Sequence, residues 1–109
     1  MNFNEYQKAA ISTAIYPRDK YAIIYPSLGL CGESGEVVEK IKKIIRDKNG
    51  EFSLDAMNEI AKELGDVLWY IANIAEDMGF SLDEIARMNI AKITKRQIEN
   101  KLNGNGDNR

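Results

Sequence analysis

Two pairs of carboxylates are the side chains of this sequence best suited to chemistry. Glu33 and Glu36 are three residues apart, as are Glu63 and Asp66, and both pairs fall in segments with helical periodicity. Residues at this spacing share one face of a helix, so each pair sets two negative charges side by side. A hard cation with oxygen ligands relieves that repulsion, and a chain without histidine has little to offer a softer metal. The spacing therefore predicts a Mg2+ site, with Mn2+ as the alternative cation, in a metal-dependent enzyme.

The position of these acids beside apolar stripes favours a site over a solvated surface. At about 100° per residue along a helix, each pair lies on the shoulder of an apolar stripe. If the two helices pack through those stripes, the four carboxylates face one another across a groove, which is costly without a cation. Either pair alone is typical of a solvated helix face, and this is the alternative interpretation. The stripes comprise Leu30, Val37, Val38, Ile41, Ile44 and Ile45, and then Ile60, Leu64, Val67, Leu68, Ile71, Ile74, Ala75 and Met78.

The elements that must position these acids are helices, and we expect an all-α fold, a bundle of about four helices per chain. Ser53 is a suitable N-cap for the third helix and Gly79 a suitable stop for it, while Ser81 and Glu84 form a capping-box pattern for the fourth. Residues 1–100 then form one domain, and residues 101–109 are a polar, glycine-rich tail that does not fold on its own. The expected helices span about residues 4–15, 26–46, 54–78 and 82–100.

Composition excludes several classes of function. A chain of 109 residues with a net charge of −2 has no basic surface for nucleic acid. No apolar run approaches the roughly 20 residues of a membrane span, and the N-terminus does not resemble a signal peptide. Cys31 has no partner cysteine, so we expect a small buried hydrophobic residue in a reducing, cytoplasmic protein.

The fourth segment adds cations, and the third adds an unusual tryptophan. Asn89, Lys92 and Arg96 follow at i, i+3 and i+7, where they can hold phosphate oxygens. Alternatively, the two cations extend past apolar neighbours into water. Trp69 lies towards the polar side of its helix, near Lys62 and Asn73, where it can stack on a base or be buried in a subunit interface.

Two sequence motifs carry a resemblance to a known family. Residues 29–40 read Gly-Leu-Cys-Gly-Glu-Ser-Gly-Glu-Val-Val-Glu-Lys, and residues 63–70 read Glu-Leu-Gly-Asp-Val-Leu-Trp-Tyr. Together they resemble the signature of the MazG-type nucleotide pyrophosphohydrolases, in their small single-domain form. The resemblance extends through Asn89-Ile-Ala-Lys92 to the closing Gly-Asp-Asn-Arg. Cys31 departs from the alanine common at its position in the family.

The resemblance implies an enzyme that hydrolyses nucleoside triphosphates to monophosphate and pyrophosphate with Mg2+. It implies a homodimer or homotetramer, which the wide apolar arc of the third segment also favours. The base and sugar of the substrate are not determined by the sequence, and the alternative from another class is a non-catalytic oligomeric helical module. By position, the resemblance assigns metal ligation and catalysis to Glu33, Glu36, Glu63 and Asp66, and nucleotide contacts to Tyr70, Asn89, Lys92 and Arg96, with Trp69 as our candidate for the base.

Overall fold

The described part of the chain is helical, with no strand. The structure, a computed structural model, describes residues 1–100 and 106–107, so most of the expected tail lies outside the described residues. This confirms the all-α expectation, with four long helices and one short helix among the described residues. The helices are α1 (Phe3–Ser12), α2 (Arg18–Tyr21), α3 (Ile24–Asp47), α4 (Leu54–Met78) and α5 (Leu82–Ile98).

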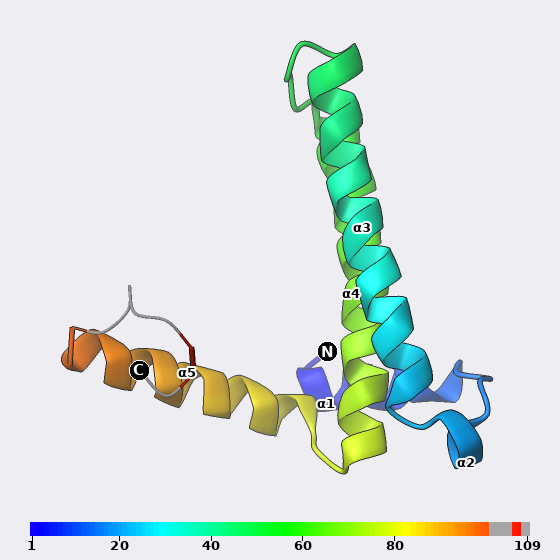
Figure 1. Ribbon diagram of the computed structural model, residues 1–109, viewed down its shortest axis with the longest axis vertical. Coiled ribbons are helices and arrows are strands. Elements are labelled where there is room, and N and C mark those ends of the chain that lie inside the picture. The colour runs from blue at the N-terminus through cyan, green and yellow to red at the C-terminus, as the bar shows by residue number, and fades with distance from the viewer. Residues whose placement is uncertain (101–105, 108–109) are drawn as a thin grey trace.

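A long antiparallel hairpin of α3 and α4 dominates the molecule (Figure 1). The ends of α4 follow from local chemistry, as expected: the Ser53 hydroxyl accepts a hydrogen bond from the Ala56 amide, and Gly79 adopts a left-handed conformation with φ of 81°. Ser81 opens α5 with the expected capping box, in which its side chain and that of Glu84 each cap the other's backbone amide.

The segment between α1 and α3 differs from expectation. A short helix, α2, forms in the link where none was expected, and α3 begins at Ile24 rather than at Pro26. Pro26 fits inside the first turn of α3 because amides there have no intrahelical partner to lose. Helix α1 ends at Ser12, three residues before the expected end, since the next amides form only a closing turn.

The core lies at the base of the hairpin, where α1 crosses α4. Small side chains bring the helices together there, so the side of α4 that carries Trp69 and Asn73 is covered. The expectation that this side is polar was wrong: Asn73 is fully buried, and its amide donates to the Trp69 carbonyl at 2.9 Å. The core consists of Ala10, Ala72, Ala75 and Leu82, with Tyr6, Trp69, Ile71 and Ile85 packed against it.

Asp77 ties the link between α1 and α3 to the end of α4. Its buried carboxylate accepts hydrogen bonds from the Tyr16 hydroxyl at 2.8 Å and the Ile23 amide at 3.0 Å, and it forms an ion pair with Arg18. Burial alone raises the pKa of this carboxyl, but the two hydrogen bonds and the Arg18 charge together lower it. Burial, and next the hydrogen bond to Asp77, raise the pKa of Tyr16 to about 12.

Helix α5 leaves the hairpin after its first turns and extends sideways as an arm (Figure 1). The chain measures 43 × 43 × 27 Å, and its radius of gyration of 16.7 Å exceeds the roughly 13 Å of a compact domain of this length. Its accessible surface of 8020 Å2 is about a third larger than a compact chain of this mass exposes. A single chain is therefore an open arrangement of helices and not a closed bundle.

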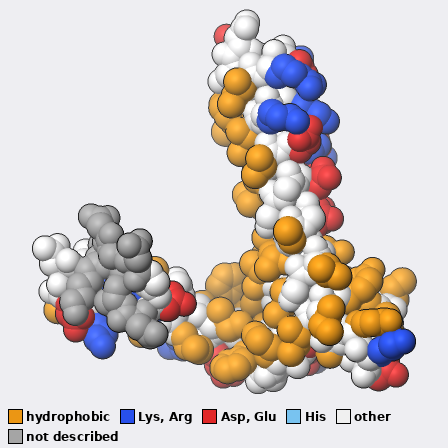
Figure 2. Space-filling view, in the orientation of Figure 1, with side chains coloured by type: hydrophobic (Ala, Val, Ile, Leu, Met, Phe, Trp, Pro, Cys, Tyr) orange, Lys and Arg blue, Asp and Glu red, His pale blue; other side chains and the backbone are white. Residues whose placement is uncertain are grey.

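Part of this extra surface is apolar. Figure 2 shows hydrophobic side chains gathered at the base of the hairpin and along one edge of it. Val38 and Ile45 were expected in the packed stripe of α3 but are 65% and 64% exposed, because only the side of that stripe with Ile44 meets α4. Cys31 is also exposed, so the expectation of a buried thiol was wrong for the single chain. None of the described helices is long and apolar enough to cross a membrane.

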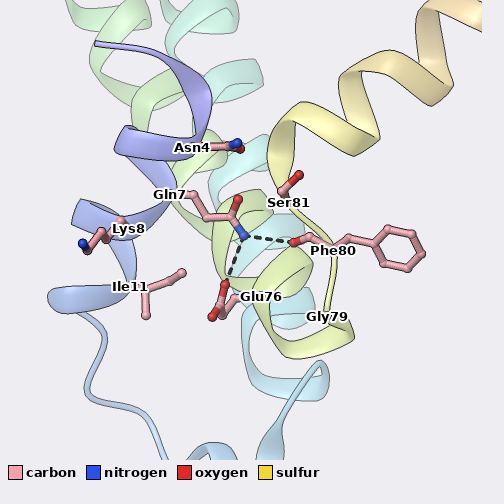
Figure 3. A pocket seen from close by; sticks show the side chains of 8 residues that line it. All are labelled: Asn4, Gln7, Lys8, Ile11, Glu76, Gly79, Phe80 and Ser81. Carbon is pink, nitrogen blue, oxygen red and sulfur yellow. Dashed lines mark hydrogen bonds between the residues drawn. The ribbon is translucent and has the colours of Figure 1, made fainter.

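Gln7 links α1 to the turn between α4 and α5. Its buried side chain lies in an open pocket of about 460 Å3 and donates to the Phe80 carbonyl at 3.0 Å and to Glu76 at 3.2 Å (Figure 3). Its carbonyl accepts from the Leu82 amide at 2.7 Å, one of the amides at the start of α5 that lack an intrahelical partner. One side chain thus holds the start of the arm against α1.

Replacing Gln7 by leucine should remove these bonds without a large change of volume. We expect the free energy of unfolding to fall by about 2 kcal/mol, because a buried amide and a carbonyl lose their partners. Chemical denaturation measures this. Gln97→Leu makes the same change at an exposed position of α5 and should cost less than about 0.5 kcal/mol. Equal losses in the two variants would contradict the role of Gln7.

Candidate active site

The α3 and α4 hairpin brings three carboxylates together. One oxygen from each of Glu33, Glu63 and Asp66 lies within 4.8 Å of the others. The ligands of one Mg2+ stand about 2.1 Å from the ion and so about 4 Å apart at most, which makes this spacing close to that of a single coordination sphere. Glu36, the fourth predicted acid, is exposed and lies outside this group.

The electrostatics of this acidic trio, Glu33, Glu63 and Asp66, also suit a cation. Partial burial, followed by the charges of Asp66, Glu63 and Glu36, raises the pKa of Glu33 above its ordinary value. Lys40 lies 3.7 Å from Glu63 and 3.6 Å from Glu59, and one lysine cannot neutralise the group. All the donors are carboxylate oxygens, so the residues present fit a hard divalent ion better than a soft one.

Tyr70 stands beside the trio, as the predicted site requires. Burial raises its pKa, and so do the nearby Tyr25, Glu33 and Asp66. Its ring lies directly against the backbone of Gly29: a Cβ atom at Gly29 would stand 2.1 Å from Cε1 of the ring. The lack of a side chain at Gly29 therefore determines where the Tyr70 ring can lie.

Trp69 is held by α1. Its indole donates to the Thr13 hydroxyl at 2.8 Å, and its ring meets that of Tyr70 edge to face with centroids 4.9 Å apart. Tyr6, also on α1, is close enough to the trio for burial and then the Asp66 charge to raise its pKa. Trp69 therefore packs against the Tyr70 ring, and Tyr70 in turn lies beside the trio.

The predicted phosphate ligands of α5 lie apart from the acids within one chain. Asn89 is exposed, and both Lys92 and Arg96 bond to Asp107. All three stand on the arm, which diverges from the hairpin (Figure 1). The structure therefore brings Tyr70 and three of the acids together, but it does not bring the α5 residues to them.

Two features of the site could not be predicted from the sequence. The contact of Gly29 with Tyr70 joins residues far apart in the chain, and the glycines among the acids signalled only that something approaches closely there. The pairing of Lys40 with Glu63 depends on the register of the hairpin, which the apolar stripes do not specify to one residue.

Gly29→Ala should displace the Tyr70 ring. We expect it to lower the free energy of unfolding by about 1–3 kcal/mol, as overpacking does. Gly32→Ala is the matched control, since a Cβ there meets nothing within 4 Å, and it should stabilise the helix by about 0.5–1 kcal/mol. Thermal and denaturant unfolding of both variants measures this. A stabilising Gly29→Ala would show that the ring does not require the glycine.

Comparisons with known proteins identify the family of this chain. The MazG nucleotide pyrophosphohydrolase domain matches residues 27–99, which include the trio, Tyr70 and the whole of α5. The chain is similar to the Gene 37 protein of Mycobacterium phage L5, with 38% identity over 114 residues that span the whole of both proteins. No solved structure matches the chain. The family is generally dependent on divalent metals, as the acidic trio suggests. The chain belongs to the MazG nucleotide pyrophosphohydrolase domain family.

Proposed function

We propose that this chain is a Mg2+-dependent hydrolase that cleaves nucleoside triphosphates between the α- and β-phosphates, releasing pyrophosphate. The observation that carries the proposal is the convergence of Glu33, Glu63 and Asp66 from two helices, with Tyr70 beside them. A surface that served only for solvation would gain nothing from holding three carboxylates this close. Family membership supports the reaction class, and the geometry supports the place where it occurs.

Each residue of the site has a distinct role in this proposal. Glu33, Glu63 and Asp66 would hold the cation, which supplies charge neutralisation for the polyphosphate oxygens. Glu36 lies one turn further along α3, outside the trio, and forms no ion pair among the described residues. A carboxylate that does not bind the cation can act as the general base, and we propose Glu36 for this role towards the attacking water. Tyr70 presents its hydroxyl beside the trio and would orient the nucleotide.

The cations of α5 would complete the site from a second copy of the chain. Lys92 and Arg96 are on α5, which diverges from the hairpin that carries the acids (Figure 1), yet a pyrophosphate leaving group needs neutralisation. The open shape, the large accessible surface and exposed apolar residues such as Val38 and Ile45 all favour a homodimer or a higher symmetric oligomer. In such an assembly the arm of one copy would reach the hairpin of another.

Glu63→Gln tests the acidic trio. We expect Mg2+-dependent release of pyrophosphate to fall by at least about 100-fold. Loss of a residue that only orients a metal ligand already reduces activity by up to about 100-fold, and Glu63 would bind the cation directly. Glu59→Gln is the control: Glu59 is one turn away on the same helix, pairs with the same Lys40 and lies outside the trio. The assay uses a panel of ribo- and deoxyribonucleoside triphosphates.

Wild-type turnover in Glu63→Gln would overturn the assignment. Thermal unfolding with and without Mg2+ gives a second measurement, since a cation bound to the trio should stabilise the wild type and not the variant. If the wild type neither hydrolyses any nucleotide of the panel nor gains stability from Mg2+ and nucleotide, a non-catalytic helical module is the better description.

Subunit mixing tests whether the site is shared between copies. Glu63→Gln chains carry intact arms, and Lys92→Gln chains carry intact acids. Refolded together in equal amounts, the two inactive variants should recover about a quarter of wild-type activity, because half of the dimers are mixed and each has one complete site. If the acids and the arm act within one chain, mixing would restore nothing.

A further inference from the structure

The two cations of the α5 arm already bind an anion, the side chain of Asp107. Lys92 and Arg96 are four residues apart on α5, so they lie on one face of the helix. The Lys92 ammonium donates to Oδ1 of Asp107 at 3.0 Å, and the Arg96 Nη2 lies 3.4 Å from the same oxygen. Nη2 also donates to the carbonyls of Asp107 at 2.8 Å and Gly106 at 3.2 Å. The hydrogen bond from Lys92, and next that from Arg96, lower the pKa of this carboxyl.

The Arg96 guanidinium is buried and only partly used. Its side chain is 8% exposed, and its Nε atom is buried without a hydrogen-bond partner in the described part of the chain. A guanidinium has five donors in a planar fork, and all of its hydrogen bonds to residues 106–107 come from the one nitrogen, Nη2. A buried donor without an acceptor is a reason to expect a further ligand.

The Asp107 carboxylate, in contrast, is easily displaced. Its side chain is 80% exposed, so its ion pairs with Lys92 and Arg96 are screened by water and contribute little. A phosphate group carries more charge and more acceptor oxygens than a carboxylate. Two of its oxygens can accept hydrogen bonds from the guanidinium fork at once. The arm thus has a buried guanidinium beside a partly exposed lysine, and the anion between them is weakly held.

We propose that Asp107 is an internal anion that occupies the Lys92 and Arg96 site until a polyphosphate group replaces it. The chemical class of the competing ligand is phosphate, as the end of a nucleotide or as free pyrophosphate. The proposal rests on the role of these two cations in the proposed function, and it adds that Asp107 lowers the affinity of that site for phosphates. Asp107 thereby favours ligands with enough charge to displace it.

Pyrophosphate binding measured by calorimetry tests the competition. The titration is done on the full chain in chelator without divalent ions, so that the acidic trio contributes no metal-mediated binding. We expect Asp107→Asn to bind pyrophosphate about fivefold more tightly than the wild type, the upper range for loss of an exposed ion pair. Asp83→Asn is the matched control. It removes the same charge from an ion pair with Arg87 on the same helix, at 2.7 Å, and should leave the affinity within about twofold.

A further variant locates the binding event. Lys92→Gln should bind pyrophosphate more weakly than the wild type. Adding Asp107→Asn to the Lys92→Gln variant should then change the affinity by less than the same substitution does in the wild type. Unchanged or weaker binding by Asp107→Asn, an equal gain in Asp83→Asn, or full additivity with Lys92→Gln would each overturn the proposal. Hydrolysis by the wild type is measured separately. An active enzyme in which Asp107 does not compete with pyrophosphate would refute the role of Asp107 and leave the proposed function intact. Competition in a chain that hydrolyses nothing would refute only the reaction.

Discussion

Repulsion between three carboxylates, held face to face by the packing of two antiparallel helices, is the interaction on which the proposed function of this chain depends. Helix α3 contributes Glu33, and α4 contributes Glu63 and Asp66, with oxygens within 4.8 Å of one another. Packing of the apolar sides of α3 and α4 must offset this repulsion, because Lys40 is the one cation among the described residues that pairs with Glu63. A divalent cation would remove the conflict, which is why the same arrangement that weakens the free hairpin suits it to polyphosphate chemistry.

Local signals in the sequence were sufficient to predict those features of the structure that depend on residues close together in the chain. Ser53, Gly79 and Ser81 mark helix ends because caps and left-handed stops involve atoms only a few positions apart. The pairing of acids across α3 and α4 was also predictable, since their spacing and the apolar stripes place them on facing shoulders. The signature shared with the family added the reaction class, which spacing alone does not contain.

Features that depend on distant contacts were not predictable in this way. Asn73 reads as a polar surface residue along α4, but α1 and the link after it cover that side, and Arg18 is its partner from 55 positions earlier. Asp77 similarly gathers three groups from the link, although nothing near it in sequence indicates them. Val38 was misplaced because periodicity identifies an apolar stripe without stating how much of it one neighbouring helix can cover.

The bond between Gln7 and the first amide of α5 connects two parts of the chain that perform different tasks. The first ten residues contain none of the acids or cations of the site, yet they hold the origin of the arm that carries Lys92 and Arg96. The direction in which α5 extends is thereby set by residues other than those that carry the carboxylates of the hairpin. In the proposed assembly, a change in the amino-terminal helix would therefore alter the reach of the arm between copies while every carboxylate stays in place.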